Sequence, residues 1–275
     1  MSAFIRKSTF RIVLPVAVIL TACATAPYTQ RSQLMLISPG EENQLGAQAF
    51  QQILSKEKVL RDPALQAVVD RIGWRVANAA NRPDFQWQFV VIDNPKMANA
   101  FALPGGKVAV YTGMFPVART EGGLAAVMAH EVGHVLARHG GERLSQGLLA
   151  QMGAAAVQVG MAGSNPGVVQ GVMVAYGLGA NVGVLLPYSR LQESEADGIG
   201  VILMAQAGYD PREAVQLWQR MAKQDRQAPP EFLSTHPSPG TRIQELERLM
   251  PKALTYYRPT PEQVPESTRL LPGIK

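Results

Sequence analysis

The stretch His130-Glu-Val-Gly-His134 constrains this chain more than any other. Apolar residues flank it at helical spacing from Leu124 to Val135, so the stretch is predicted to lie on a helix. Two histidines at this spacing lie above one another on one helix face, and their imidazole nitrogens can converge on one metal ion. Glu131 points about 100° further round the helix, where it stays off the metal and can take a proton from an attacking water.

This arrangement of two ligands and a general base is that of the zincins, in which a catalytic zinc ion also needs a third protein ligand and an open fourth position. Metzincins take a third histidine from the pattern His-x-x-Gly-x-x-His. Here Ala137 stands at the glycine position and Gly140 at the histidine position, and His139 misses that position by one residue. The third ligand is therefore expected from elsewhere in the chain.

An acidic segment further along the chain offers such a ligand. Glu193 and Asp197 are spaced to share one helix face, whereas Glu195 points to another side. Glu193 can bind the metal while Asp197 hydrogen-bonds the far nitrogen of a ligand histidine and fixes its tautomer. In isolation such a stretch is more typical of a solvated helix face. Beside His130 and His134, the interpretation as part of a metal site is favoured.

Four blocks of sequence occur together in this chain: Asn99-Ala-Phe-Ala-Leu-Pro-Gly-Gly106, the His130 motif running on to Arg138-His139, Tyr188-Ser-Arg190 with Glu193-Ser-Glu-Ala-Asp197, and Ser234-Thr-His-Pro237. In these blocks the chain resembles the zinc endopeptidases that include HtpX, the CAAX prenyl proteases and the mitochondrial OMA proteases. It looks nearest to the periplasmic lipoprotein proteases of the BepA and LoiP type. We expect no long carboxy-terminal helical-repeat segment of the kind that BepA has.

The resemblance implies an α+β, mainly helical, gluzincin-like zinc metallopeptidase domain with a small β-sheet beside the metal-binding helix. It implies one Zn²⁺ per chain, with these ligands: His130, His134 and Glu193. It makes Glu131 the catalytic base and places Asp197 behind the ligands. His236 matches a histidine near the metal in such proteins. There it would either stabilise the oxyanion or occupy the open zinc position in a resting form.

The first 22 residues are typical of an exported lipoprotein. Basic residues at positions 6 to 11 precede a short apolar run, and Leu20-Thr-Ala-Cys23 then resembles a bacterial lipobox. Cys23 is the only cysteine in the chain, so it forms no internal disulfide, and lipidation after cleavage gives it a role. Several acyl chains anchor a protein stably where one does not. The alternative is an ordinary cleaved signal with a free thiol.

The residue after Cys23 is Ala24, which by resemblance to lipoprotein sorting rules favours the outer membrane of a Gram-negative bacterium, with the protein facing the periplasm. The formal net charge of +5 falls to +2 without the three basic residues of segment 1–22. We therefore expect no nucleic-acid partner.

The sequence predicts five segments: a signal peptide at 1–22, a lipidated tether at 23–36, a helical lead-in packed on the catalytic part at 37–85, the zinc metallopeptidase domain at 86–250, and a proline-rich tail at 251–275. The tail is expected to be either an irregular strap or a disordered end. A last helix is predicted from about 239 to 250, on which Arg242 and Arg248 are expected to be surface charges, although Arg242 could brace the site.

Two strands are predicted before the metal-binding helix, at 87–92 and 107–111, with a turn at 103–106 between them. Strands beside such a helix often present an edge to which an extended peptide can add. We therefore expect a peptide-binding edge at 107–111.

The segment 144–189 contains no Asp, Glu, Lys, Arg or His and is rich in Gly and Ala. Three interpretations remain open for it. It can form a transmembrane hairpin, a pair of buried core helices, or a helix followed by a mobile lid over the cleft or facing the membrane.

The expected function, by resemblance, is zinc-dependent endoproteolysis in the bacterial envelope, where unfolded or misassembled outer-membrane proteins are degraded as quality control. A processing peptidase with narrow specificity is one alternative. A lipoprotein chaperone or scaffold with a structural or latent zinc site is another. The sequence leaves the natural substrate and the oligomeric state open.

Overall fold

The computed structural model describes residues 23–26, 28–161, 165, 190–224, 236 and 239–274. The chain divides into two compact units, one made of 1–38 with 141–185 and the other of 39–140 with 186–275. The predicted signal peptide at 1–22 and most of the segment after position 161 and before position 190 lie outside the described residues, as do all members of the block 234–237 except His236.

The smaller unit contains a two-stranded antiparallel hairpin, in which β1 (Cys23–Thr25) pairs with β2 (Ser32–Leu34). The hairpin is joined to helix α6 (His139–Gly160) by the ion pair of Arg31 with Glu142, in which two nitrogen–oxygen contacts of 2.7 Å run in parallel. Most described side chains of α6 beyond Ser145 are partly or fully exposed. None of the described helices is long and apolar enough to cross a membrane.

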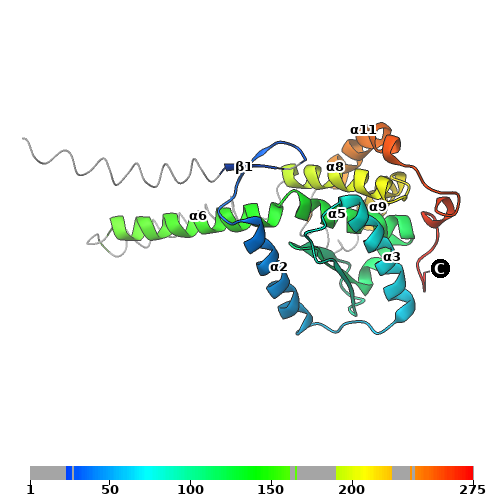
Figure 1. The fold of residues 1–275 in the computed structure, drawn as a ribbon, viewed down its shortest axis with the longest axis horizontal. Coiled ribbons are helices and arrows are strands. Elements are labelled where there is room, and N and C mark those ends of the chain that lie inside the picture. The colour runs from blue at the N-terminus through cyan, green and yellow to red at the C-terminus, as the bar shows by residue number, and fades with distance from the viewer. Residues whose placement is uncertain are drawn as a thin grey trace, which may run out of the picture. The chain divides into compact units, whose positions relative to one another are not determined.

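The larger unit is mainly helical (Figure 1). Its helices are α2 (Pro39–Leu54), α3 (Pro63–Ala80), α4 (Phe115–Ala118), α5 (Glu121–Leu136), α8 (Arg190–Gln206), α9 (Arg212–Gln224) and α11 (Pro239–Tyr256), with short 3₁₀ turns at Thr112–Met114 and Val264–Glu266. Helix α5 packs against α3, α8, α9 and the sheet, and all of its residues are buried. The metal-binding motif therefore lies in the centre of the core.

Local sequence signals explain where two of these helices begin. Asp62 accepts hydrogen bonds from the first free amides of α3, and Pro63 occupies the first helical position. Thr120 caps α5 by accepting from the amide of Gly123 at 3.0 Å. These contacts explain why α3 begins at Pro63 and α5 at Glu121. The predicted mainly helical α+β fold with a small sheet beside the motif is confirmed.

The sheet has three strands in the order β3 (Gln88–Ile92), β5 (Lys107–Tyr111) and β4 (Ala100–Leu103). Strand β5 is central, parallel to β3 and antiparallel to β4, and it is buried along its whole length. The expectation of a peptide-binding edge at 107–111 is therefore wrong. The sequence pattern does not indicate strand β4, because its short apolar stretch runs directly into the predicted turn.

The two edge strands of this sheet, β3 and β4, have different neighbours. Along β3, the Leu60 amide donates to the Val91 carbonyl at 2.8 Å, and the Gln66 amide side chain bonds the Phe89 carbonyl and the Val91 amide. This edge is thus covered by polar partners from the same chain. Strand β4 instead lies beside the metal-binding helix α5.

The C-terminal segment 257–274 forms an irregular strap along the start of α5. The amides of Glu121 and Gly122 donate to the carbonyls of Arg269 and Ser267, at 2.9 and 3.0 Å. These bonds satisfy amides that a helix N-terminus leaves without intrahelical partners. The predicted end of the last helix at about 250 is wrong, because α11 continues through Pro251 to Tyr256 and includes the first six residues of the predicted tail.

Candidate metal centre

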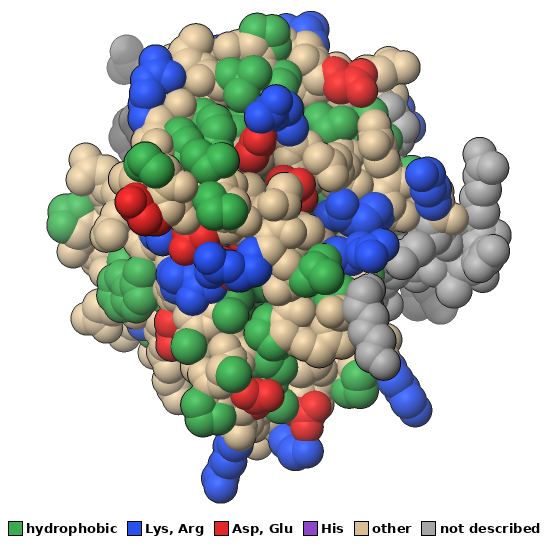
Figure 2. Space-filling model, turned by 90° about the vertical axis from the view of Figure 1, so that its right-hand side faces the viewer, with side chains coloured by type: hydrophobic (Ala, Val, Ile, Leu, Met, Phe, Trp, Pro, Cys, Tyr) green, Lys and Arg blue, Asp and Glu red, His purple; other side chains and the backbone are tan. Residues whose placement is uncertain are grey.

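All four histidines of the chain gather in one buried region of the larger unit, and none is more than 4% exposed. Figure 2 accordingly shows no histidine on the face that it draws. His130 and His134 come from α5, His139 begins α6, and His236 follows α9. This burial argues against four ordinary surface histidines, since imidazoles are usually only partly buried.

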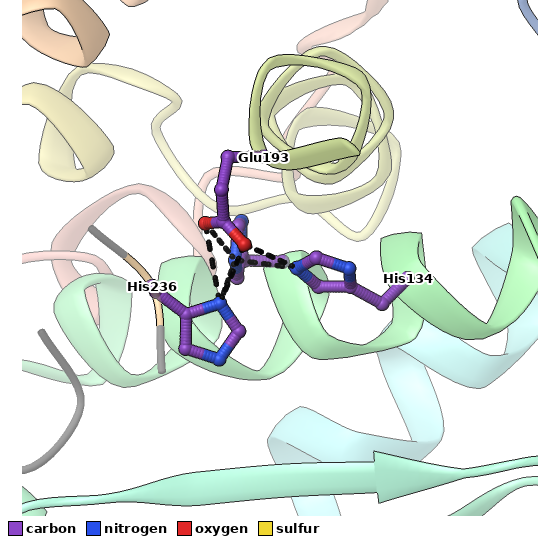
Figure 3. Close-up of side chains that lie close together, drawn as sticks. His134, Glu193 and His236 are labelled. Atoms are coloured by element: carbon purple, nitrogen blue, oxygen red, sulfur yellow. Dashed lines mark hydrogen bonds and ion pairs between the residues drawn. The ribbon is translucent and has the colours of Figure 1, made fainter. Parts of the chain in front are cut away.

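Four of the predicted site residues bring their donor atoms together: His130, His134, Glu193 and His236. The Nε2 atoms of His130 and His134 are 3.0 Å apart, and the Glu193 carboxylate lies 3.5 Å from the first and 3.4 Å from the second. His236 Nδ1 is 3.0 Å from Glu193 Oε1 and 3.3 Å from His130 Nε2. In Figure 3 the Glu193 carboxylate is directed towards the rings of His134 and His236.

These spacings fit a tetrahedral zinc site. Donors about 2.0–2.1 Å from a central Zn²⁺ lie about 3.3–3.4 Å from one another at the corners of a tetrahedron. The five separations given above, 3.0 to 3.5 Å, bracket that value, and all four donors lie within 4.8 Å of one another. Imidazole nitrogens and a carboxylate oxygen are also a donor set that zinc prefers. The residues present therefore fit the metal that the sequence predicts.

Two glycines let the helices α5 and α8 approach closely enough to bring these donors together. A Cβ added at Gly133 would lie 2.8 Å from the Ala196 carbonyl oxygen. One added at Gly200 would lie 2.9 Å from the His130 Cα. Neither contact has room for a side chain, so the helix crossing that delivers Glu193 to the two histidines depends on glycine at both positions.

Behind His130 stands a carboxylate held by an arginine. His130 Nδ1 lies 3.0 Å from Asp197 Oδ1, and both Asp197 oxygens accept from the Arg242 guanidinium at 2.6 Å. Arg242 also contacts Glu193 at 2.7 Å and stacks on Trp218, with its guanidinium carbon 3.6 Å from the ring centroid. Arg242 is buried. The expectation of a surface charge is wrong for Arg242, and the alternative that it braces the site is confirmed.

The charges around His130 favour a positive charge at its ring. Burial lowers the pKa of His130, as does the charge of Arg242, but hydrogen bonds with Asp197 and Glu193 outweigh them and raise it to about 9. Burial raises the pKa of Glu193, yet its hydrogen bonds to the histidines hold it far below the usual range. A proton and a metal cation are alternative ways to supply that positive charge.

His134 is supported by a different pair of residues. Its Nδ1 lies 2.8 Å from His139 Nδ1, and His139 Nε2 lies 3.1 Å from Glu195 Oε2. Both partners are buried. From the sequence, His139 is considered only as a zinc ligand, and Glu195 is expected to point away from the site. The contacts His134–His139 and His139–Glu195 are therefore not predicted.

Glu131 is buried next to the four donors. Its Oε1 has no hydrogen-bond partner among the described residues and lies 3.4 Å from His236 Nε2. Burial raises the pKa of the Glu131 carboxyl, while His236, His130 and the backbone of Ala102 in β4 act to lower it. The carboxylate therefore stands between the donor set and strand β4, where a general base is expected.

The model of peptidase family M48 matches residues 63–250, which is more than half of the chain. The chain belongs to peptidase family M48. Membership of this peptidase family and relatives that are named as metalloendopeptidases support metalloendopeptidase activity. The matched range includes α5, α8 and position 236, and therefore Glu131 and every donor of the candidate site.

Named relatives of this M48 chain come from mitochondria and from bacteria. It is 35% identical over 234 residues to the mitochondrial metalloendopeptidase OMA1 of Schizosaccharomyces pombe, covering 82% of this chain and 66% of that protein. It is 30% identical over 251 residues to OMA1 of Saccharomyces cerevisiae, covering 84% and 70%. It is also 30% identical over 227 residues to the beta-barrel assembly-enhancing protease of Escherichia coli, covering 80% and 46%. The chain thus spans about two thirds of the yeast proteins and less than half of the bacterial one.

The remaining predicted residues of the M48 chain are placed as follows. Asp197 lies behind His130, as the spacing of the acidic segment predicts. Cys23 lies in β1 of the smaller unit, paired with Leu34. Its lipidation stays a prediction.

Proposed function

We propose that the chain is a zinc-dependent endopeptidase of the bacterial cell envelope that degrades misfolded or stalled outer-membrane proteins. The single observation that carries the zinc chemistry is the buried set of four close donor atoms beside Glu131. The envelope location is supported by the lipobox-like Leu20-Thr-Ala-Cys23 and by the name of the E. coli relative. Because other relatives are named as mitochondrial, the location rests chiefly on the sequence pattern.

In this proposal His130, His134 and Glu193 hold the zinc ion. When bound, Zn²⁺ supplies Lewis acidity, which polarises the scissile carbonyl and makes water easier to deprotonate. Glu131 takes the proton as the water oxygen attacks the peptide carbon, and it delivers that proton to the departing amine nitrogen as the C–N bond breaks. A carboxyl whose pKa is raised by burial suits this double role, because its proton affinity lies closer to the working pH.

His236 takes the fourth corner of the donor set, which hydrolysis needs for water. It is the one donor that lies on neither α5 nor α8. We propose that this is the resting arrangement, and that His236 leaves the corner when substrate binds. The same observation favours a second candidate function, a lipoprotein chaperone or scaffold in which the zinc site is structural or latent.

Strand β4 is the proposed docking edge for the substrate. It lies beside α5, while the other edge of the sheet is covered by Leu60 and Gln66. Main-chain hydrogen bonds from β4 to an extended peptide would tolerate many sequences, as degradation of unfolded proteins requires. A competing peptide should lose most of its inhibition when its backbone amides are methylated at alternate residues. Full inhibition by the methylated peptide would contradict this docking mode.

Anchoring through Cys23 would keep the protease at the outer membrane. Three acyl chains on a cleaved amino terminus give stable attachment, since each buried methylene contributes about 0.8 kcal/mol. Metabolic labelling with palmitate should mark the wild type and leave Cys23→Ser unlabelled. Labelling of both proteins, or of neither, would argue against the anchor.

The proposal is tested by measuring zinc content and cleavage of an unfolded outer-membrane protein for the wild type, Glu131→Gln and His236→Ala. About one zinc is expected in each protein. Cleavage should fall by about 10²- to 10⁴-fold in Glu131→Gln and rise in His236→Ala. A fall of about two to three decades in His236→Ala would instead make His236 an oxyanion stabiliser.

Two further outcomes separate the alternatives. Zinc binding by all three proteins without cleavage by any of them would favour the chaperone or scaffold. Equal cleavage of the unfolded outer-membrane protein and of its folded form in a bilayer would contradict the proposed substrate class.

A further inference from the structure

His139 lies directly against the back of His134 and is fully buried. The two Nδ1 atoms are 2.8 Å apart, a normal hydrogen-bond distance. On its other side, His139 Nε2 lies 3.1 Å from Glu195 Oε2. A buried imidazole with a close partner on each ring nitrogen is a specific arrangement, because each contact requires a defined proton position.

Only one placement of protons satisfies these contacts when His134 is a neutral ligand. His134 turns Nε2 towards the donor set, so its ring hydrogen is on Nδ1 and is donated to His139 Nδ1. His139 then accepts at Nδ1 and carries its own hydrogen on Nε2. That hydrogen is donated to the Glu195 carboxylate. The three residues thus form a directional chain of two hydrogen bonds that ends on a carboxylate.

We propose that His139 and Glu195 are positioning residues that hold His134 in the tautomer and orientation needed to bind zinc. This inference rests on the proposed function, because it assigns His134 to the metal. Neither residue touches the reacting atoms, and both act through the His134 ring. Their effect is expected on metal affinity first, since groups behind a metal ligand typically contribute about 10- to 100-fold in affinity or activity.

A backbone turn between α5 and α6 brings His139 back towards His134. Five residues along a continuous helix correspond to about 500°, which would place His139 about 140° away from His134 round the axis. Instead α5 ends at Leu136, and Arg138 adopts a left-handed backbone conformation with φ of 59°. This conformation is unusual for a residue other than glycine.

An ion pair holds this turn in place. Arg138 Nε donates to Glu42 Oε2 of α2 at 2.6 Å, and the Glu42 side chain is buried. Burial raises the pKa of Glu42, and the contact with Arg138 acts to lower it. A strained backbone position that is secured by a buried contact is typical of functional sites. The turn thus fixes His139 at the point where it can reach His134 Nδ1.

The test compares two substitutions of His139 in the full chain. His139→Phe keeps an aromatic ring and removes both nitrogens, whereas His139→Asn keeps an oxygen at the position of Nδ1 that can accept from His134 Nδ1. Zinc affinity is measured by competition with a chelator. His139→Phe should bind zinc about 10- to 100-fold more weakly than the wild type, and His139→Asn should recover most of that loss. Asp84→Asn, an exposed site paired with Arg82, is the control and should be unchanged.

The tautomer gives a second readout that does not depend on a variant. Nitrogen-15 NMR of the zinc-loaded wild type should show His134 protonated at Nδ1 and metal-bound at Nε2. His134 bound through Nδ1, or equal zinc affinity in wild type and a folded His139→Phe, would overturn the inference. If His139→Phe does not fold, Glu195→Gln and the NMR measurement decide. Failure of the wild type to bind zinc or to cleave would instead overturn the proposed function.

Discussion

The two histidines of the metal-binding helix are supported in different ways. Behind His130 stand full charges, the Asp197 carboxylate and the Arg242 guanidinium, which come from α8 and α11. Behind His134 stands the ring of His139. The His130 support joins helices that are distant in sequence, whereas the His134 support begins with a residue of the next turn.

Because of this difference, substitutions on the two sides should affect protein stability and zinc affinity to different extents. Removing one member of a buried charge pair leaves the other without compensation, which is strongly destabilising. Removing a neutral imidazole from behind His134 leaves one buried donor unsatisfied and loosens one ligand. We therefore expect changes on the His130 side to affect both folding and zinc affinity, and changes on the His134 side to affect chiefly zinc affinity.

The largest effect is expected from Arg242→Leu. This change removes the partner of both Glu193 and Asp197, and the metal-free protein should lose about 3–5 kcal/mol of unfolding free energy. Urea unfolding in the presence of a chelator measures the loss. Arg248→Leu on the exposed face of the same helix is the matched control and should lie within about 0.5 kcal/mol of wild type. Similar small losses in both variants would show that the buried charges do not stabilise the fold.

The next largest effect compares the carboxylates behind the two histidines. Asp197→Asn should weaken zinc binding by about 10- to 100-fold, because Asp197 contacts a ligand ring directly. Glu195→Gln should weaken it less, because His139 lies between Glu195 and the ligand. Chelator competition on both variants gives the ratio of their zinc affinities. A larger loss of zinc affinity in Glu195→Gln than in Asp197→Asn would contradict this prediction.

A third prediction concerns the helix crossing that both supports require. Gly200→Ala places a methyl group 2.9 Å from the His130 Cα, and this overpacking should cost about 1–3 kcal/mol. Gly198→Ala lies on the same helix with its nearest neighbour 3.7 Å away. It should be neutral or stabilising, since alanine exceeds glycine in helix propensity by about 1 kcal/mol. Thermal unfolding of the two variants checks this contrast, and equal shifts would argue against a tight crossing at Gly200.

The smallest effect is expected at the far end of α5. Thr120→Ala removes the cap of the Gly123 amide and the hydrogen bond to Glu213, and it should cost about 1 kcal/mol of stability. Zinc affinity should stay unchanged, because the cap lies at the opposite end of the helix from His134. Urea unfolding and chelator competition are measured together. Weaker zinc binding in this variant would mean that general loosening of α5, rather than the local supports, sets metal affinity.

What the sequence can predict follows from helical periodicity. The spacing within the motif and within the acidic segment determines which side chains share a helix face. The site residues that this spacing identifies are His130, His134, Glu193 and Asp197. The fold class follows from the resemblance to a known family.

What the sequence cannot predict depends on contacts between distant segments or on one backbone angle. Arg242 is charged and lies on an amphipathic helix, so its burial over Trp218 has no local signal. His139 reaches His134 only because Arg138 takes a left-handed conformation. Strand β4 is four residues long, and its pairing with β5 is a tertiary contact.

The most direct test of the central claim is a crystal structure of the zinc-loaded protein with diffraction data collected at the zinc absorption edge. The account predicts one anomalous peak per chain, bonded to His130 Nε2, His134 Nε2 and a Glu193 oxygen at about 2.0–2.2 Å. His139 and Glu195 should remain hydrogen-bonded behind His134, away from the peak. A zinc ion bound by His139 or Glu195, or bound away from α5, would contradict the account.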